Sequence, residues 1–209
     1  MIIDLTHPLT PEIPSWDGGC GFRLTTITDF TDCSGPDRFR VQEFSSRAGL
    51  GTHIDAPAHC FPGATTVDEL PLETLVTNCV VIKPADIADH SYIVMPDAIQ
   101  TFEREHGTIP PNSFVIVYTG WSTYWNEPEK YRNKLRFPSV HESTAQLLLE
   151  RKIAGLGTDT LSADSRGQSF PVHRAILGAG KYLVENIANA DLLPAVGAKS
   201  FILPIKIKD

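Results

Sequence analysis

The stretch Gly49-Leu-Gly-Thr-His-Ile-Asp-Ala-Pro-Ala-His59 places two histidines and an aspartate within seven residues. In an extended strand His53 and Asp55 point to the same face, because side chains alternate with a period of two. Pro57 interrupts ladder pairing and turns the chain, so that His59 can approach that face. Two imidazoles and one carboxylate suit zinc and similar divalent ions. The alternative is a set of ordinary polar residues at a strand end, but the flanking Gly-Thr and the proline favour a metal site.

Composition places the chain among ordinary globular proteins. The 209 residues include 42% hydrophobic and 21% charged residues, which predicts one domain spanning residues 1–209 with a substantial core. The formal charge of -7 argues against a nucleic-acid partner, which requires a concentrated basic patch. The only basic cluster is interpreted as a solvated loop and consists of Lys130, Arg132, Lys134 and Arg136.

Cysteine usage and hydropathy indicate the expected environment of the chain. Cys20, Cys33, Cys60 and Cys79 are widely spaced without a Cys-x-x-Cys motif, which predicts reduced thiols and a cytoplasmic protein. Cys60 is not expected to be a metal ligand, because adjacent residues of a strand point to opposite faces. The first residues do not resemble a signal peptide, and no apolar run is long enough to span a membrane. We therefore expect no membrane partner.

Apolar runs bounded by turn residues predict several strands and helices. Residues 96–106, which begin with proline and are followed by Gly107, have the signature of a helix. Ser139-Val-His-Glu142 resembles a capping box that starts a second helix, and residues 171–177 predict a third. Strands and helices alternate without a regular βαβ rhythm, so an α/β fold with a mixed sheet is expected. Strands are predicted at residues 2–5, 22–27, 39–44, 79–82, 114–118, 153–156, 182–184 and 201–207.

A metal ion held by three nearby groups usually takes a further ligand from a distant segment. His173 begins the predicted helix at 171–177, and Glu185 follows the strand at 182–184. From the pattern alone this pair remains a candidate, because a histidine at a helix start is often structural. The other histidines occur where helix caps or surface positions are expected, and they are His7, His90, His106 and His141.

Several motifs together resemble the cyclase family of metal-dependent hydrolases, which includes bacterial kynurenine formamidases. The family signature His-x-Gly-Thr-His-x-Asp-x-x-x-His matches Gly51 to His59 after its opening histidine. Further similar landmarks are Pro14-Ser-Trp16, Thr119-Gly-Trp121, Gly157-Thr-Asp-Thr-Leu-Ser-Ala-Asp164, His173 and Val184-Glu185-Asn186. The resemblance covers essentially the whole chain. It implies a swivelling β/β/α fold, a divalent metal (zinc first, then manganese), hydrolysis of an amide or lactam such as N-formylkynurenine, and a homodimer or homotetramer.

The chain departs from the family signature at Gly49, where the family carries the first histidine. In family terms two metal positions share Asp55. One would be held by His53 and Asp55 alone, and the other by Asp55, His59, His173 and Glu185. Because the first position lacks a ligand, the resemblance implies one ion per chain, with His53 as a partial ligand or a base.

The resulting hypothesis is a hydrolase in which metal-activated water adds to an amide or formyl carbonyl of a small molecule. His53 or His59 would carry a proton to the leaving nitrogen. Trp16 and Trp121 are candidates to sandwich an aromatic substrate, with core packing as the alternative for each. Three activities remain open. The first is an arylformamidase acting on N-formylkynurenine, the second is a lactam or lactone hydrolase, cyclase or dehydratase, and the third is a metal- or ligand-binding protein without turnover.

Overall fold

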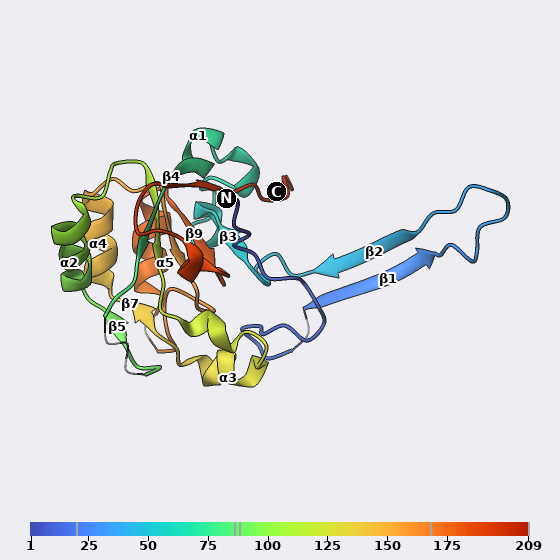
Figure 1. The fold of residues 1–209 in the computed structure, drawn as a ribbon, viewed down its shortest axis with the longest axis horizontal. Helices are drawn as coiled ribbons and strands as arrows, with labels where there is room; N and C mark the ends of the chain where they lie inside the picture. Colours follow the sequence, from blue (N-terminus) through green and yellow to red (C-terminus); the bar gives the residue numbers. More distant parts are fainter. Residues whose placement is uncertain (20, 86, 88, 168, 209) are drawn as a thin grey trace.

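Six strands form the central sheet of the computed structural model, which describes residues 1–19, 21–85, 87, 89–167 and 169–208 (Figure 1). Four inner strands are parallel, and an antiparallel strand lies at each edge, which confirms the predicted α/β class with a mixed sheet. In spatial order the strands are β10 (Ala198–Phe201), β4 (Val76–Ile82), β6 (Ser113–Val117), β8 (Gly155–Thr158), β9 (Tyr182–Glu185) and β3 (His53–Asp55).

Both faces of this sheet are covered. On one face lie α2 (Pro96–His106), α4 (Glu142–Glu150) and α5 (Pro171–Gly178), which Figure 1 shows grouped together. Val80 and Ile82 point into this layer, whereas the alternate residues Cys79 and Val81 pack on the opposite face. Burial on both faces explains why these strands are continuously apolar instead of alternating.

The remaining elements are short and connect or border the main layers. The parallel pair β5 (Ile93–Val94) and β7 (Ser139–Val140) lies beside the helical layer. The others are η1 (Pro57–His59), η2 (Val67–Glu69), α1 (Leu72–Leu75), η3 (Trp121–Tyr124), α3 (Pro128–Arg132), η4 (Asn133–Leu135) and η5 (Ala190–Leu192). Within the described ranges, no helix is long and apolar enough to cross a bilayer.

A long hairpin projects from the body of the molecule (Figure 1). Its strands, β1 (Phe22–Thr28) and β2 (Val41–Ser46), pair antiparallel with a bulge between Thr26 and Thr28. These strands correspond to the predicted strands at 22–27 and 39–44. We call residues 21–47 the arm.

Two predicted strands are not formed as expected. Residues 2–5 form no strand, because single hydrogen bonds such as Ala188 N–H to the Leu5 carbonyl replace a ladder. The closing strand, predicted at 201–207, is instead β10 at Ala198–Phe201. Beyond it Pro204 cannot donate a ladder hydrogen bond, and the chain continues without strand pairing.

Two smaller expectations are also corrected. Ser139 lies in β7, and the helix after it is capped by His141, whose ring nitrogen accepts a hydrogen bond from the Ser143 N–H. Three residues of the basic cluster lie in helices instead of a loop: Lys130 and Arg132 in α3 and Lys134 in η4, with Arg136 directly after them. Arg132 donates a hydrogen bond to the Trp16 carbonyl. Cys33, Cys60 and Cys79 are free thiols, whereas Cys20 lies outside the described residues.

Candidate metal centre

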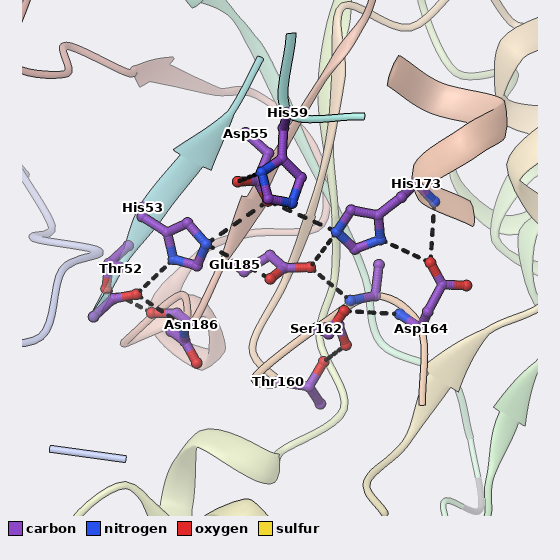
Figure 2. Close-up of polar contacts among 12 residues, drawn as sticks. Thr52, His53, Asp55, His59, Thr160, Ser162, Asp164, His173, Glu185 and Asn186 are labelled. Carbon is purple, nitrogen blue, oxygen red and sulfur yellow. Dashed lines mark hydrogen bonds and ion pairs between the residues drawn. The ribbon is translucent and has the colours of Figure 1, made fainter. Parts of the chain in front are cut away.

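Two adjacent strands and one helix deliver the predicted ligands to one place. His53 and Glu185 are directly opposite each other in the antiparallel pairing of β3 with β9. The strand period places Asp55 on the same face as His53, and the η1 turn that starts at Pro57 brings His59 back towards it. His173 approaches from α5. Figure 2 shows that the five predicted side chains converge.

Asp55 and Glu185 connect the histidines of this cluster. His53 Nε2 lies 3.7 Å from Asp55 Oδ2 and 3.7 Å from Glu185 Oε2. His173 Nε2 lies 3.7 Å from Asp55 Oδ2 and 3.4 Å from Glu185 Oε1. On the outer side, His59 Nδ1 is 3.9 Å from Asp55 Oδ1. The two carboxylates therefore bridge nitrogen donors from three segments of the chain.

These residues form two potential ligand groups that share Asp55. One contains Asp55, His59 and His173, and the other contains His53, Asp55 and Glu185. In each group the ligand atoms lie within 4.8 Å of one another, so a single ion could contact all three after small side-chain movements. The sequence interpretation placed Glu185 with His59 and His173. The structure places Glu185 between the two groups: its Oε1 lies 3.4 Å from His173 Nε2, and the pairing of β9 with β3 also brings its Oε2 within 3.7 Å of His53 Nε2.

The electrostatics of the cluster favour a bound cation. Burial raises the pKa of Glu185, although His173 opposes the shift. Burial also acts against the charged form of Asp55, but a hydrogen bond from His173 and the nearby histidine charges lower its pKa overall. Desolvation disfavours protonated His173, yet hydrogen bonds to Asp164 and Asp55 raise its pKa to about 11. Buried carboxylates that stabilise a proton this strongly can also stabilise a metal ion, and the mixed nitrogen and oxygen donors fit zinc or manganese.

Asp164 orients His173, a role that the sequence interpretation did not assign. Its carboxylate accepts hydrogen bonds from the Val172 and His173 backbone N–H groups and from His173 Nδ1 at 2.7 Å. With Nδ1 donating, Nε2 of the neutral ring keeps its lone pair towards Asp55 and Glu185. A carboxylate behind a ligating histidine is a common arrangement in metal sites.

The carbonyl of Gly51 orients His53 in a similar way. It lies 2.9 Å from His53 Nδ1, and because a carbonyl can only accept, Nδ1 carries the hydrogen and Nε2 faces the cluster. Asn186 donates its Nδ2 to the same carbonyl at 2.8 Å and accepts from the Tyr131 hydroxyl at 2.9 Å. Asn186 therefore ties the loop before β3 to the end of β9.

The two predicted aromatic residues lie in different surroundings. Trp121 packs edge-on against Tyr124 and donates its Nε1–H to the Tyr131 carbonyl, within an aromatic cluster. Trp16 borders this cluster, and the centroid of its ring lies 5.7 Å from that of Phe170. The Phe170 ring in turn packs edge-on against His173, with a centroid distance of 5.6 Å. Phe170 was not singled out from the sequence, and it is 44% exposed beside the ligand group. Substrate binding by Trp16 and Trp121 remains a prediction.

Buried Asp159 holds the segment that carries Trp121. It accepts hydrogen bonds from the Thr119 N–H and hydroxyl and from the Ser122 N–H. Burial raises the pKa of Asp159 despite these hydrogen bonds. Its position far from solvent and its saturated hydrogen bonding indicate a structural role.

His7 and Cys60 both lie outside the two ligand groups. His7 was expected at a cap or on the surface, but its half-buried ring stacks on Trp125 with a centroid distance of 3.9 Å. The expectation failed because Trp125 comes from a distant segment. Cys60 follows His59 but is not in either ligand group, and burial raises the pKa of its thiol. A thiol of this kind is a poor nucleophile at neutral pH.

Comparison with known proteins identifies the family. Residues 3–165 match the Cyclase family model, whose description is "Putative cyclase". The chain therefore belongs to the cyclase family of metal-dependent hydrolases.

Characterised relatives include two enzyme types. An isatin hydrolase of Roseibium aggregatum is 28% identical over 76% of this chain, and the match covers just under two thirds (66%) of that protein. A kynurenine formamidase of Bordetella petrii is 24% identical over 90% of this chain and 83% of that protein. Isatin hydrolase A from Labrenzia aggregata has a solved structure that aligns with a TM-score of 0.88 and 31% identity, covering 100% of this chain and 88% of that one.

Proposed function

We propose that this protein hydrolyses the carbonyl–nitrogen bond of an amide attached to an aromatic ring, and that a cyclic amide of the isatin type is the first candidate substrate. The observation that carries this proposal is the alignment with isatin hydrolase A along the whole chain, which includes the segments that hold the ligand groups. The candidate that came first from the sequence, an aryl formamide, becomes the second.

The reaction requires water to add to the amide carbonyl and a proton to reach the leaving nitrogen. A carbon–oxygen bond forms, the carbon–nitrogen bond breaks, and the carbonyl carbon becomes a carboxylate while the nitrogen becomes an aryl amine. In a cyclic amide both groups remain on one ring-opened product. A divalent ion bound at the cluster would lower the pKa of water and polarise the carbonyl. We propose one such ion per chain, zinc first and manganese second. Asp55, His59 and His173 would hold it, with Glu185 alongside.

His59 is better placed for proton transfer than His53, because it would bind the ion through Nδ1, the nitrogen that faces Asp55, and Nε2 would remain for the proton. The His59 side chain is 56% exposed at the edge of the cluster, where it can meet both substrate and solvent. His53 is 11% exposed, its Nδ1 is occupied by the Gly51 carbonyl, and its Nε2 faces two carboxylates. This geometry supports His53 as a ligand. Its buried partners leave it no route for handing a proton to a leaving group.

Phe170 and Trp16 supply an aromatic surface next to the ligand group. The exposed Phe170 ring touches His173 edge-on, and the Trp16 ring is tilted against Phe170 with a centroid distance of 5.7 Å. An aryl substrate whose carbonyl meets the cluster could place its ring against Phe170, because tilted and offset aromatic pairs are favourable. We therefore expect Phe170→Ala to raise KM for an aryl amide more than it changes kcat.

An aryl formamide is the second candidate. Its support is the match to kynurenine formamidases, which extends over 90% of the chain for the Bordetella petrii enzyme and 99% for the Salinibacter ruber enzyme. N-formylkynurenine would undergo the same addition of water, with formate as the carboxylate product. A lactone hydrolase, a cyclase or dehydratase, and a binding protein without turnover are the remaining alternatives.

A substrate comparison tests the proposal. The purified protein is loaded separately with zinc and manganese, and its metal content is measured by elemental analysis. Hydrolysis of isatin and N-formylkynurenine is then followed by absorbance. We expect isatin to have the higher kcat/KM and His173→Ala to abolish turnover. Higher kcat/KM for N-formylkynurenine would select the second candidate, and a metal-loaded, folded protein that hydrolyses neither would support the binding-protein alternative.

A further inference from the structure

Asn186 is a buried polar residue to which the proposed reaction gives no task. It directly follows Glu185 at the end of β9 and is 1% exposed. Its φ of 56° is a left-handed conformation, which asparagine adopts more readily than most residues. Its backbone N–H, its backbone carbonyl and both polar atoms of its side chain all form hydrogen bonds. Asn186 is therefore the centre of a fully satisfied buried network.

Two of these hydrogen bonds hold the peptide that joins Gly51 to Thr52. The Asn186 side chain donates its Nδ2–H to the Gly51 carbonyl at 2.8 Å. The Asn186 backbone carbonyl accepts from the Thr52 hydroxyl at 2.6 Å. Figure 2 shows Asn186 beside Thr52 and His53. One residue thus clamps both sides of the peptide that precedes His53.

This peptide needs a clamp because Gly51 does not restrict it. Gly51 has a φ of +66°, and a Cβ there would lie 2.5 Å from Leu9 Cδ2, so only glycine fits. Glycine lacks the steric restriction of a side chain, and the peptide that follows it can turn over more easily than elsewhere. Turning a peptide over exchanges the directions of its carbonyl and its N–H. The choice between the two orientations must therefore come from a group outside the loop.

The orientation of the Gly51 peptide decides which nitrogen of His53 carries the hydrogen. The Gly51 carbonyl lies 2.9 Å from His53 Nδ1 and can only accept, so Nδ1 carries the hydrogen. Nε2 then keeps its lone pair, and it lies 3.7 Å from carboxylate oxygens of both Asp55 and Glu185. A backbone N–H in place of the carbonyl would require the lone pair on Nδ1 and would move the hydrogen to Nε2. A ring in that tautomer cannot bind a metal ion through Nε2.

The Asn186 amide selects the first orientation. Its Nδ2 is a donor and pairs with a carbonyl, whereas a turned peptide would set an N–H against it. The other end of the amide is fixed by Tyr131, which is completely buried and donates its hydroxyl to Asn186 Oδ1 at 2.9 Å. Without that hydroxyl, Oδ1 would lose the donor that satisfies it in the interior, at a cost in free energy. Tyr131 therefore stabilises the arrangement in which Asn186 holds the Gly51 carbonyl.

We propose that Asn186, supported by Tyr131, is a positioning residue that keeps His53 in the tautomer whose Nε2 can bind a metal ion. This inference rests on the metal-dependent function proposed above, and it extends the control of the site to residues outside both ligand groups. Asp164 orients His173 by direct contact, whereas Asn186 acts on His53 through a backbone carbonyl. Groups behind a ligand commonly set its orientation and its tautomer in this way.

Two variants remove the proposed contacts with little change elsewhere. Asn186→Gly removes the carboxamide and keeps the left-handed backbone, which glycine adopts without strain. Its matched control is Asn189→Gly, because Asn189 is exposed, has a φ of 53° and also donates to a backbone carbonyl. Tyr131→Phe removes only the hydroxyl. Its control is Tyr182→Phe, which removes another hydroxyl that donates to a backbone carbonyl, from a tyrosine that is also buried.

The tautomer of His53 is measured on the metal-free protein, so this test does not depend on the proposed function. A long-range 1H–15N spectrum of protein with labelled histidine distinguishes Nδ1–H from Nε2–H at about pH 8, where an ordinary imidazole is neutral. The His53 signals are those missing from His53→Gln. We expect only the Nδ1–H form in the wild type and both controls, a substantial Nε2–H fraction in Asn186→Gly and a smaller one in Tyr131→Phe.

An unchanged His53 tautomer in folded Asn186→Gly would overturn the proposal. Circular dichroism shows whether each variant is folded. If Asn186→Gly does not fold, Tyr131→Phe decides in the same way, because it retains the amide and loses only the donor to Oδ1.

Zinc affinity distinguishes positioning of His53 from a general structural role. Asn186→Gly should bind zinc roughly 10-fold more weakly than the wild type in competition with a chelator, because His53 belongs to a ligand group and loses its orientation. The same substitution in a His53→Ala protein should have little further effect, since the ring that it orients is absent. Equal losses in both backgrounds would overturn the positioning role, and so would a changed tautomer with wild-type zinc affinity. Failure of the proposed function is a separate result, in which the zinc-loaded wild type hydrolyses neither substrate whatever the His53 tautomer.

Discussion

His173 Nδ1 lies 2.7 Å from Asp164 Oδ2, and the same carboxylate anchors the first turn of α5 through two backbone N–H groups. One buried side chain therefore sets both where the helix starts and which nitrogen of His173 faces the metal-binding cluster (Figure 2). The geometry of the site thus depends on a residue that would not itself contact a metal ion.

Asp164→Asn should weaken metal binding. The amide can replace only part of the acceptor capacity of the carboxylate, so His173 loses its fixed orientation. We expect the affinity for zinc to fall roughly 10- to 100-fold, measured by competition with a chelator. Asp89→Asn is the control, because Asp89 also accepts a backbone N–H and a hydroxyl but is exposed and away from the cluster. Equal zinc affinity in wild type and Asp164→Asn would exclude the orienting role.

Removal of single ligands should separate the proposed site from its neighbours. His59→Ala and Glu185→Ala should each lose bound metal and activity, because His59 belongs to the group proposed to hold the ion and Glu185 Oε1 lies beside that group, 3.4 Å from His173 Nε2. Cys60→Ser and His141→Ala should retain both, since Cys60 is not in either group and His141 is a helix cap. Elemental analysis after dialysis measures the difference. A Glu185→Ala protein that keeps its metal would show that Glu185 is not a ligand.

Local sequence patterns were sufficient for the parts of this site that lie close together in the chain. His53, Asp55 and His59 are presented by one strand and one turn, and their spacing alone predicted their convergence. The helix at Pro96–His106 was predicted with its exact ends, because proline and glycine mark both.

Contacts between distant segments were not predictable from such patterns. The pairing of Glu185 with His53 depends on the register between β3 and β9, and the partner of His7 is a tryptophan far along the chain. Asp164 and Asn186 were recognised in family motifs, but hydrogen bonds to His173 and Gly51 define their roles only in the folded chain.

His7 should make stability depend on pH. Burial lowers the pKa of His7 to about 4, and its Nε2 is buried without a hydrogen-bond partner among the described residues. The ordinary pKa of histidine is about 6.5, so the unfolded chain takes up this proton first as pH falls. The His7 contribution is therefore fully present above pH 6.5 and decreases as pH falls towards 4.

Replacing the ring should remove this part of the pH dependence. Urea unfolding of His7→Phe and wild type is compared at pH 7.5 and pH 5. On going from pH 7.5 to pH 5, the free energy of unfolding should decrease less for His7→Phe than for the wild type. A phenyl ring can stack on Trp125 but cannot be protonated. Exposed His90 provides the control His90→Phe, which should follow the wild type. Parallel losses in His7→Phe and wild type would mean that His7 does not contribute.

Gly49→His should raise the number of metal ions bound per chain. The backbone of Gly49 is outside the left-handed region, so an L residue is not strained there. A Cβ at this position would lie 3.4 Å from His53 Nε2, beside the group formed by His53, Asp55 and Glu185. The new imidazole would supply the donor that the family signature has and this chain lacks. We expect the number of metal ions per chain, measured by elemental analysis, to rise from about one towards two, because the metal position at His53 and Asp55 would gain the ligand that it lacks.

Gly49→Ala separates the effect of the imidazole from that of the Cβ. It introduces the same close approach to His53 but no donor, and it should keep the wild-type stoichiometry. Thermal unfolding of all three proteins is measured on the samples used for metal analysis. If Gly49→His is as stable as Gly49→Ala and still binds the same number of ions as the wild type, the missing histidine is not what limits binding. The limit would then lie in the negative charge and spacing of the carboxylates of Asp55 and Glu185, which both ions would have to share.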